Sequence, residues 1–333
     1  MITKIFTALF LLISITLVWL WTEYNAALTT AVIVKESRVI EIKKGDSFTK
    51  ITDKLLDQQV AIKPLWFKVI AYQQKVANKL KAGEYELKPG LTMPDILAVF
   101  VKGKSRQYSI TFPEGWSFKQ IIAKIQQNPN IKQTIENVDY QDILAKLDSN
   151  YKHPEGLFFP DTYFFDKDTT DINLLKVAYN KMQLVLKQEW ESKEENLPLK
   201  SPYEALILAS IVEKETGAAI ERAQISGVFT RRLRKGMLLQ TDPTVIYGMG
   251  DSYKGNIRYK DLRQATAYNT YVIKGLPPTP IAMPGKDAIH AAVHPKKGKS
   301  LYFVAKGNGQ GTHVFSATLR EHNNAVNKYQ RKR

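Results

Sequence analysis

The sequence predicts an α+β protein with a single N-terminal transmembrane helix, a small α/β subdomain and a larger mixed α/β domain. Three observations predict this class: an apolar run near the N-terminus, a strand–turn–helix pattern that occurs three times, and later apolar segments with helical period. At 333 residues the chain is long enough for two domains. We expect an N-terminal tip and anchor at 1–24, a linker at 25–37, the subdomain at 38–105 and the main domain at 106–333.

The transmembrane helix is predicted from an apolar run of 17 residues, Ile5 to Trp21. As a helix it spans roughly 25 Å, close to the roughly 30 Å hydrocarbon core of a bilayer. Lys4 precedes it, and Trp19, Trp21 and Tyr24 close it, which matches the positive-inside rule and an interfacial aromatic belt. A cleaved signal peptide is the alternative, but the bulky residues at the end offer no small-residue cleavage site. We therefore expect a single-pass inner-membrane anchor, with the bulk of the chain in the periplasm or outside the cytoplasm.

The composition excludes several classes of protein. With 44% hydrophobic and 24% charged residues, the chain is neither disordered nor polytopic. It has no Cys, which excludes thiolate catalysis, iron–sulfur clusters and disulfides. We interpret its scattered histidines as lacking a metal-ligand spacing, so we expect no structural zinc and no cofactor. The histidines are His153, His290, His294, His313 and His322.

A net charge of +16 and a pI near 9.6 favour a polyanionic partner. Nucleic acid, an anionic membrane surface and a cell wall with free peptide carboxylates all meet that description. The anchor places the basic part of the chain outside the cytoplasm, and no nucleic-acid-binding motif accompanies the charge. We therefore expect no nucleic-acid partner.

A pattern of strand, Gly turn, Ser or Thr, and apolar-periodic helix occurs three times after the linker, twice within the subdomain and once at the start of the main domain. Gly supplies the turn geometry, and the Ser or Thr caps the helix that follows. Thr92 with Asp95 and Ser117 with Gln120 have the spacing of capping boxes. The three copies begin at Ile40, Tyr85 and Ile110.

The first copy of this pattern resembles the opening of a LysM module, a small βααβ fold associated with glycan binding. The resemblance implies a LysM-like subdomain over 38–105. A structural spacer that holds the main domain away from the membrane is the alternative, and the residues fit both interpretations.

The main domain is predicted to be mostly helical, with a hairpin near its end. Strands at 301–305 and 312–316 flank a Gly-rich turn that suits a hairpin. Apolar periodicity predicts helices at 118–128, 139–147, 171–194, 202–216, 219–236 and 318–330.

The helix predicted at 202–216 ends on two carboxylates. On a 3.6-residue period Glu215 shares the apolar face of Leu208 and Ile211, while Glu213 lies about 200° away from it. Burial raises the pKa of a carboxyl group and lets it act as a general acid near neutral pH. We therefore predict that Glu215 is a catalytic acid and that Glu213 is an ordinary solvated anion. A helix-end carboxylate that reaches water is the alternative for Glu215.

Several motifs surround this Glu-Lys-Glu-Thr run in the sequence. They are Glu155–Tyr163 (EGLFFPDTY), Leu239–Gly248 (LQTDPTVIYG), Tyr268–Tyr271 (YNTY), Gly275–Pro278 (GLPP) and Ile281–Gly285 (IAMPG). Together they resemble the endolytic murein transglycosylases, the MltG or YceG-like family, and the resemblance runs from the anchor to about residue 329. In that family the second Glu of the Glu-Lys-Glu-Thr run is catalytic, which is Glu215 here.

The resemblance implies a lyase of cell-wall biogenesis that cuts nascent peptidoglycan glycan strands. Glu215 would protonate the β-1,4 glycosidic oxygen between MurNAc and GlcNAc, and would then accept the proton of the C6 hydroxyl as that oxygen closes onto C1. The product is a 1,6-anhydro-MurNAc end, and no water is consumed. The family also implies cooperation with peptidoglycan synthases.

Candidates for sugar contacts combine hydrogen-bonding groups with flat rings. They are Thr216, Gln240, Asp242, Tyr247, Tyr268, Asn269 and Tyr271. A structural role is the alternative for each. If Glu155 or Asp161 lies across from Glu215 with room for a water, the chain would instead be a muramidase that hydrolyses the bond. Outside the enzyme class, the alternative is a non-catalytic, membrane-anchored glycan-binding scaffold of the wall-synthesis machinery.

Overall fold

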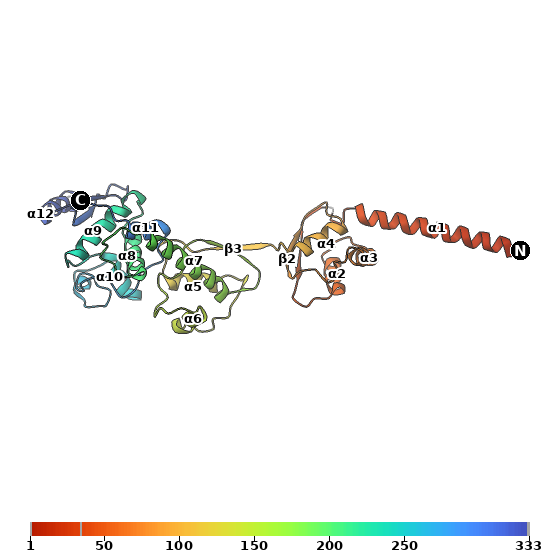
Figure 1. Ribbon diagram of the computed structural model, residues 1–333, viewed down its shortest axis with the longest axis horizontal. Helices are drawn as coiled ribbons and strands as arrows, with labels where there is room; N and C mark the ends of the chain where they lie inside the picture. Colours follow the sequence, from red (N-terminus) through yellow and green to blue (C-terminus); the bar gives the residue numbers. More distant parts are fainter. Residues whose placement is uncertain (1, 34, 332–333) are drawn as a thin grey trace. The chain divides into compact units, whose positions relative to one another are not determined.

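The computed structural model describes residues 2–33 and 35–331. The chain forms two compact units. The first contains the residues up to Tyr108 together with Phe164–Asp168, and the second contains Ser109–Tyr163 and the residues from Thr169 onward. Both units combine helices with short strands (Figure 1), so the predicted mixed α/β class is confirmed.

The first unit begins with a long apolar helix, α1 (Ile2–Thr29). Among the described residues it is the one helix that is long and apolar enough to cross a membrane, a criterion that a signal sequence also meets. Its large apolar side chains, such as Phe6, Phe10 and Trp21, are exposed. The helix continues to Thr29, so residues 25–29 of the expected linker are helical.

After α1 along the chain, the first unit continues with a strand, two helices, a second strand and a further helix. These elements are β1 (Arg38–Ile42), α2 (Phe48–Asp57), α3 (Pro64–Gln73), β2 (Gly83–Leu87) and α4 (Met93–Lys102). β1 and β2 pair antiparallel, with Ile40 opposite Tyr85. Leu55, Phe67 and Phe100 complete their fully buried core. The unit thus has a hydrophobic core of its own.

Side-chain caps start the helices that follow the Gly turns. Ser47 accepts a hydrogen bond from the first turn of α2. Thr92 with Asp95 forms a capping box at α4, and Ser117 with Gln120 forms another at the next helix. Each cap pairs a backbone N–H that the helix itself leaves without a partner. The predicted strand–turn–helix pattern and both capping boxes are therefore confirmed.

The second unit is mainly helical, and each helix predicted for it is present within a few residues of its expected bounds. These helices are α5 (Phe118–Gln126), α6 (Tyr140–Lys146), α7 (Asp171–Glu191), α8 (Pro202–Glu215), α9 (Arg222–Arg234) and α12 (Leu319–Tyr329). The start of α9 is later than expected because a 3₁₀ turn, η1 (Ala219–Glu221), precedes it. Elements without a predicted range are α10 (Asp242–Met249), η2 (Gly250–Ser252), η3 (Asp261–Arg263) and α11 (Lys286–Val293).

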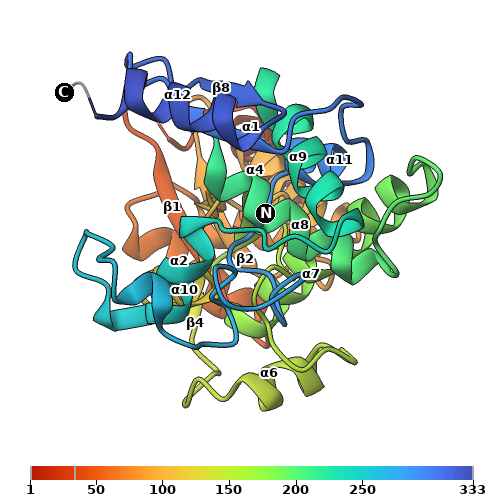
Figure 2. The same cartoon turned by 90° about the vertical axis from the view of Figure 1, so that its left-hand side faces the viewer.

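The remaining strands form small two-stranded sheets. They are β3 (Gln107–Thr111), β4 (Ile131–Lys132), β5 (Thr162–Asp166), β6 (Thr169–Thr170), β7 (Tyr302–Ala305) and β8 (His313–Ser316). β3 pairs with β5, β4 pairs with β6, and β7 forms the predicted antiparallel hairpin with β8. α12 lies along this hairpin (Figure 2).

Helix α8 lies at the centre of the second unit. It packs against α7, α9, α10 and α11 (Figure 1), and every residue from 205 to 212 is buried. Ser201 caps its first turn, and Pro202 occupies a first-turn position that needs no N–H donor. A helix that is apolar on all sides needs neighbours on all sides. The last turn of α8 is therefore held rigidly, and this turn carries the two carboxylates.

Candidate active site

Glu215 is the last residue of α8 and faces a cavity of about 450 Å³. The cavity brings together segments that are far apart in the sequence: the ends of α8 and α9, the start of α10, the β7–β8 hairpin and α12. Of the predicted site residues it is lined by Glu215, Gln240, Asp242 and Tyr271. The other side chains around it are mostly aromatic, apolar or basic, a composition typical of ligand sites.

The carboxyl group of Glu215 is desolvated. Desolvation raises its pKa to about 7, and the nearby Asp242 charge raises it as well. The hydroxyl of Thr241 opposes them, since it donates a hydrogen bond to Glu215 Oε1, which stabilises the ionised form. With a pKa near 7, Glu215 holds a proton about half of the time at neutral pH. It can therefore give up a proton and take one back under the same conditions.

Asp242, the first residue of α10, is a second carboxylate that lines the cavity. The Tyr271 hydroxyl donates a 2.6 Å hydrogen bond to Asp242 Oδ1. Desolvation first, and then Asp242, raise the pKa of Tyr271, so that hydroxyl remains a donor. Gln240 is exposed and has a left-handed φ of 51°. Such strain in a residue other than Gly is uncommon and clusters at functional sites.

Asn269 is fully buried and does not line the cavity. Its side-chain amide donates hydrogen bonds to the carbonyl oxygens of Asp261, Leu262 and Gln264, and its Oδ1 accepts one from the N–H of Tyr271. These bonds fold the segment 261–271 around one side chain. The geometry makes Asn269 a residue that positions Tyr271.

Thr216, the residue after Glu215, is buried and ends α8. Its Oγ1 accepts a 2.9 Å hydrogen bond from the N–H of Ala218. For Thr216 we expected either a sugar contact or a structural role. This hydrogen bond favours the structural role, because it stabilises the turn at the helix end.

Tyr247 and Tyr268 form a separate aromatic pair, with ring centroids 4.8 Å apart. The Tyr247 hydroxyl donates a 3.0 Å hydrogen bond to Glu155 Oε2. Glu155 Oε1 accepts another from the first N–H of α5, that of Phe118. Burial raises the pKa of Glu155 to about 7, although the residue does not line the cavity of Glu215. The two hydrogen bonds connect Glu155 to the start of α5 and to α10.

The other carboxylate considered as a partner for Glu215 is Asp161. It forms an ion pair with Lys181, and this contact lowers its pKa. Neither Asp161 nor Glu155 lines the cavity. The second carboxylate that does so is Asp242.

The expectation for Glu213 is wrong. Its side chain is only 7% exposed, it accepts a 3.0 Å hydrogen bond from the N–H of Gly285, and it lies 3.7 Å from Arg222. Desolvation raises its pKa also. The physical reason is that α8 has neighbours on every side, so the face opposite Glu215 is covered too. Glu213 serves to fasten the segment at Gly285 to the end of α8.

Four further residues at this site were not predicted from the sequence. Arg232 is buried on α9 and donates hydrogen bonds to the carbonyl oxygens of Leu239 and Leu301. Its guanidinium lies 5.1 Å from the ring centroid of Tyr302, and His322 stacks on that ring at 5.2 Å. His322 Nδ1 is buried and has no partner among the described residues. The fourth is Thr241, whose place in the LQTDPTVIYG motif was a signal that could have identified it.

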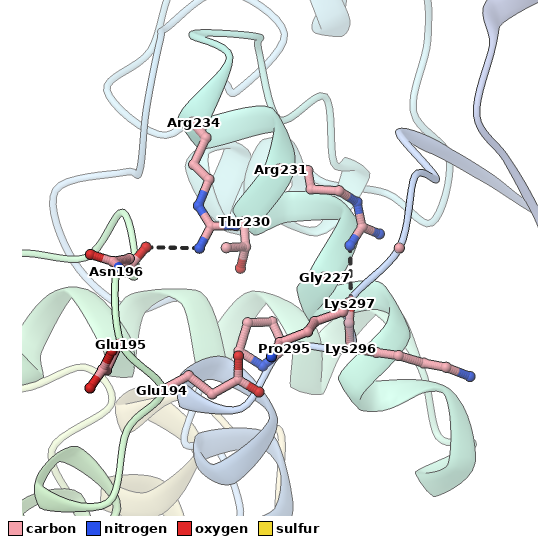
Figure 3. A pocket seen from close by; sticks show the side chains of 11 residues that line it. Glu194, Glu195, Asn196, Gly227, Thr230, Arg231, Arg234, Pro295, Lys296 and Lys297 are labelled. Carbon is pink, nitrogen blue, oxygen red and sulfur yellow. Dashed lines mark hydrogen bonds between the residues drawn. The ribbon is translucent and has the colours of Figure 1, made fainter.

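A second cavity, of about 650 Å³, lies elsewhere in the same unit and is lined by none of the predicted site residues. Figure 3 shows Arg231 and Arg234 extending from α9 toward the segments at 194–196 and 295–298. Arg231 donates to the carbonyl oxygen of Lys296, and Arg234 donates to that of Asn196. The two guanidinium groups thus hold neighbouring loops in place, and we assign the chemistry to the cavity of Glu215.

Comparison with known proteins gives a consistent result. A model of the YceG-like family matches residues 40–328. The chain is 35% identical over 308 residues to the endolytic murein transglycosylase of Bacillus subtilis (strain 168), covering 87% of this chain and 84% of that protein. It is 30% identical over 274 residues to the endolytic murein transglycosylase of Streptococcus pneumoniae (strain D39), covering 71% of this chain but 49% of that longer protein. Among solved structures it resembles a YceG-like protein from Listeria monocytogenes, with a TM-score of 0.53, 30% identity and coverage of 87% of this chain and 99% of that one.

Proposed function

The chain belongs to the YceG-like family, and we propose that it is an endolytic murein transglycosylase, a lyase that cuts peptidoglycan glycan strands. The observation that carries this proposal is Glu215, a desolvated carboxyl group with a pKa of about 7 at the wall of a cavity that can admit a sugar. A protein that only binds glycan has no use for such an acid, because burying it costs free energy.

The reaction needs one group that donates a proton and later accepts one. Protonated Glu215 gives its proton to the glycosidic oxygen between MurNAc and GlcNAc, the C1–O bond breaks, and the GlcNAc 4-hydroxyl leaves. Positive charge on C1 is stabilised by the 2-acetamido group of MurNAc. The C6 hydroxyl then attacks C1 and passes its proton to the Glu215 carboxylate, which closes the 1,6-anhydro ring and restores the acid. Atoms balance without water.

Thr241 assists the ionised half of this cycle. Its hydroxyl donates to Glu215 Oε1, which leaves the other carboxyl oxygen of Glu215 for the substrate. A hydrogen bond to the ionised form keeps the pKa from rising further above neutrality. The carboxyl group is then poised for both directions of proton transfer.

We assign sugar contacts to the polar groups that line the cavity. Gln240 is exposed there, and the Asp242–Tyr271 pair presents a hydroxyl and a carboxylate. His322 Nδ1 is a buried nitrogen that has no partner in the described part of the chain. Amides, hydroxyls and ring nitrogens can read the N-acetyl and hydroxyl groups of a saccharide. Thr216, Tyr247, Tyr268 and Asn269 act behind this surface and hold its segments in place.

A hydrolase is the second candidate, and one observation favours it. Asp242 lines the same cavity as Glu215, and a second carboxylate is what a muramidase uses to activate water or to attack C1. The two reactions differ in their products, since hydrolysis leaves a reducing MurNAc end and transglycosylation leaves an anhydro end.

We also propose a single-pass membrane anchor for α1. The exposed apolar side chains of that helix support this assignment, because soluble surfaces rarely carry so large an apolar patch.

The domain division at 1–24, 25–37, 38–105 and 106–333 remains our proposal. The β-α-α-β order of the first unit and its antiparallel β1–β2 pair support a LysM-like subdomain at 38–105. Cooperation with peptidoglycan synthases is a further part of the proposal.

Cleavage of purified strands tests the enzyme against the scaffold alternative. The full-length protein in detergent micelles is incubated with uncross-linked glycan strands, beside Glu215→Gln. Shortening of the strands by the wild type alone supports the proposal. If strands bind to both proteins and neither shortens them, the chain is a scaffold.

A further inference from the structure

Two histidines and a glutamate form a cluster in the second unit, separate from the residues that line the Glu215 cavity. His290 lies on α11, His294 follows the end of that helix, and Glu189 lies in the last turn of α7. One ligand atom from each of the three lies within 4.8 Å of the other two. The interpretation of the histidines as scattered is therefore wrong for this pair, because residues four apart share a helix face.

The cluster has the ligand chemistry of a metal site. Two imidazole nitrogens and one carboxylate oxygen are a common ligand set for zinc, which binds nitrogen and oxygen at roughly 2.0–2.2 Å. His290 Nδ1 is 2.8 Å from Glu189 Oε2, and the ring centroids of His290 and His294 are 4.3 Å apart. Ligand atoms around a tetrahedral ion are separated by about 3.3 Å, so small side-chain rotations suffice. The His290 side chain is 58% exposed and free to make them.

The groups around the cluster allow an ion to enter. Glu189 is buried, with its side chain 9% exposed, so the carboxylate is fixed in position. Lys286 Nζ lies 4.0 Å from its other oxygen, but the Lys286 side chain is 63% exposed and can turn into solvent. His294 Nε2 is 3.2 Å from Ser192 Oγ, which offers a hydrogen-bond partner rather than a competing charge. An oriented carboxylate beside two imidazoles is thus accessible from solvent.

We propose that Glu189, His290 and His294 bind a divalent transition metal ion, zinc foremost, with water at the fourth position. The ion would join the end of α7 to the end of α11. α11 packs against α8, the helix that ends in Glu215, so the ion would stabilise the support of the candidate active site. Its role is structural, and the proposal does not depend on the reaction that the chain catalyses.

Cobalt absorption gives a direct test, because Co²⁺ in a nitrogen and oxygen site has visible bands that depend on its ligands. Full-length protein in detergent micelles is stripped with a chelator and titrated with Co²⁺, and Zn²⁺ is then added in competition. We expect one saturable site, displacement of Co²⁺ by Zn²⁺, and a rise in melting temperature when Zn²⁺ is added.

Variants of the ligands complete the test. His290→Ala and His294→Ala should each weaken Co²⁺ binding more than about tenfold, since even groups behind the ligands contribute roughly 10–100-fold. His313→Ala is the matched control: His313 Nδ1 also lies near a carboxylate, 2.7 Å from Glu221 Oε2, but within the described ranges no second imidazole joins this pair. It should bind Co²⁺ like the wild type. The proposal is overturned if the wild type shows no saturable binding, or if His290→Ala and His294→Ala bind as tightly as it does.

Discussion

The hydroxyl of Thr241 donates a hydrogen bond to Glu215 Oε1 and so connects the residue before α10 to the last residue of α8. This single contact sets two properties of the candidate active site. It fixes the orientation of the carboxyl group at the cavity wall, and it stabilises the ionised form against the desolvation that raises the pKa to about 7. Proton transfer in both directions by Glu215 depends on that balance.

Activity should decline above neutral pH. Glu215 must carry a proton to protonate the glycosidic oxygen. Its pKa of about 7 means that above neutrality the protonated fraction falls about tenfold for each further pH unit. The measurement is kcat/KM for strand cleavage as a function of pH, because this profile reports the pKa values of essential groups in the free enzyme. A rate that rises steadily through about pH 9 would show that the acid is a different group.

Two substitutions beside Glu215 should move the alkaline limb of this profile in opposite directions. Asp242→Asn removes a charge that raises the pKa of Glu215, so the limb should move to lower pH. Thr241→Val removes the hydrogen bond that lowers this pKa, so the limb should move to higher pH. Glu213→Gln serves as the control, because Glu213 is not among the causes of the shift. If the alkaline limbs of Asp242→Asn and Thr241→Val moved in the same direction, the two residues would not act on the pKa of Glu215 in opposite directions.

Glu215→Gln should stabilise the fold at alkaline pH. Because the pKa of Glu215 is raised from 4.5 to about 7, the folded state binds its proton more tightly than the unfolded state does. The associated cost is absent below about pH 4.5, grows as pH rises to about 7, and is then constant, at up to about 3 kcal/mol. Denaturant unfolding at about pH 8 should show Glu215→Gln to be the more stable protein, with the difference vanishing near pH 4.5. A variant that is less stable at both pH values would contradict the desolvated-acid interpretation.

Asn269→Ala should destabilise the segment that carries Tyr271, without a direct effect on Glu215. The change removes four hydrogen bonds from a fully buried side chain and should cost about 2–4 kcal/mol of stability. Because Tyr271 depends on this segment, KM should rise more than kcat falls. Asn308→Ala, in the exposed turn of the β7–β8 hairpin, is the control and should leave both unchanged. A loss confined to kcat would place Asn269 in the chemistry instead.

Local pattern in the sequence was sufficient to predict most helices of the second unit, although not α10 and α11. Apolar periodicity and capping residues act over a few positions, and this is why Ser117 with Gln120 and the span of α8 are confirmed. The two carboxylates at the end of α8 show the limit of such reasoning. Helix phase separates Glu215 from Glu213, but only the tertiary packing decides that both faces are covered.

The far wall of the cavity was not predictable from local pattern. Tyr302 and His322 reach it from the C-terminal hairpin and helix, and Arg232 reaches it from α9. No spacing rule connects segments that meet only through the tertiary fold. Glu189 is a similar case: the His290 and His294 spacing is visible in the sequence, whereas the carboxylate beside it comes from another helix.

The chemical identity of the ends that cleavage creates distinguishes a transglycosylase from a hydrolase. Full-length protein digests uncross-linked glycan strands in water enriched in heavy oxygen, and mass spectrometry compares the products of the wild type, Glu215→Gln and Glu213→Gln. We predict anhydro-MurNAc ends, one water lighter than reducing ends and free of heavy oxygen. Glu213→Gln should still form them, while Glu215→Gln should lose at least about 10²-fold in rate. Reducing MurNAc ends that carry heavy oxygen, or undiminished cleavage by Glu215→Gln, would contradict a transglycosylase that works through Glu215.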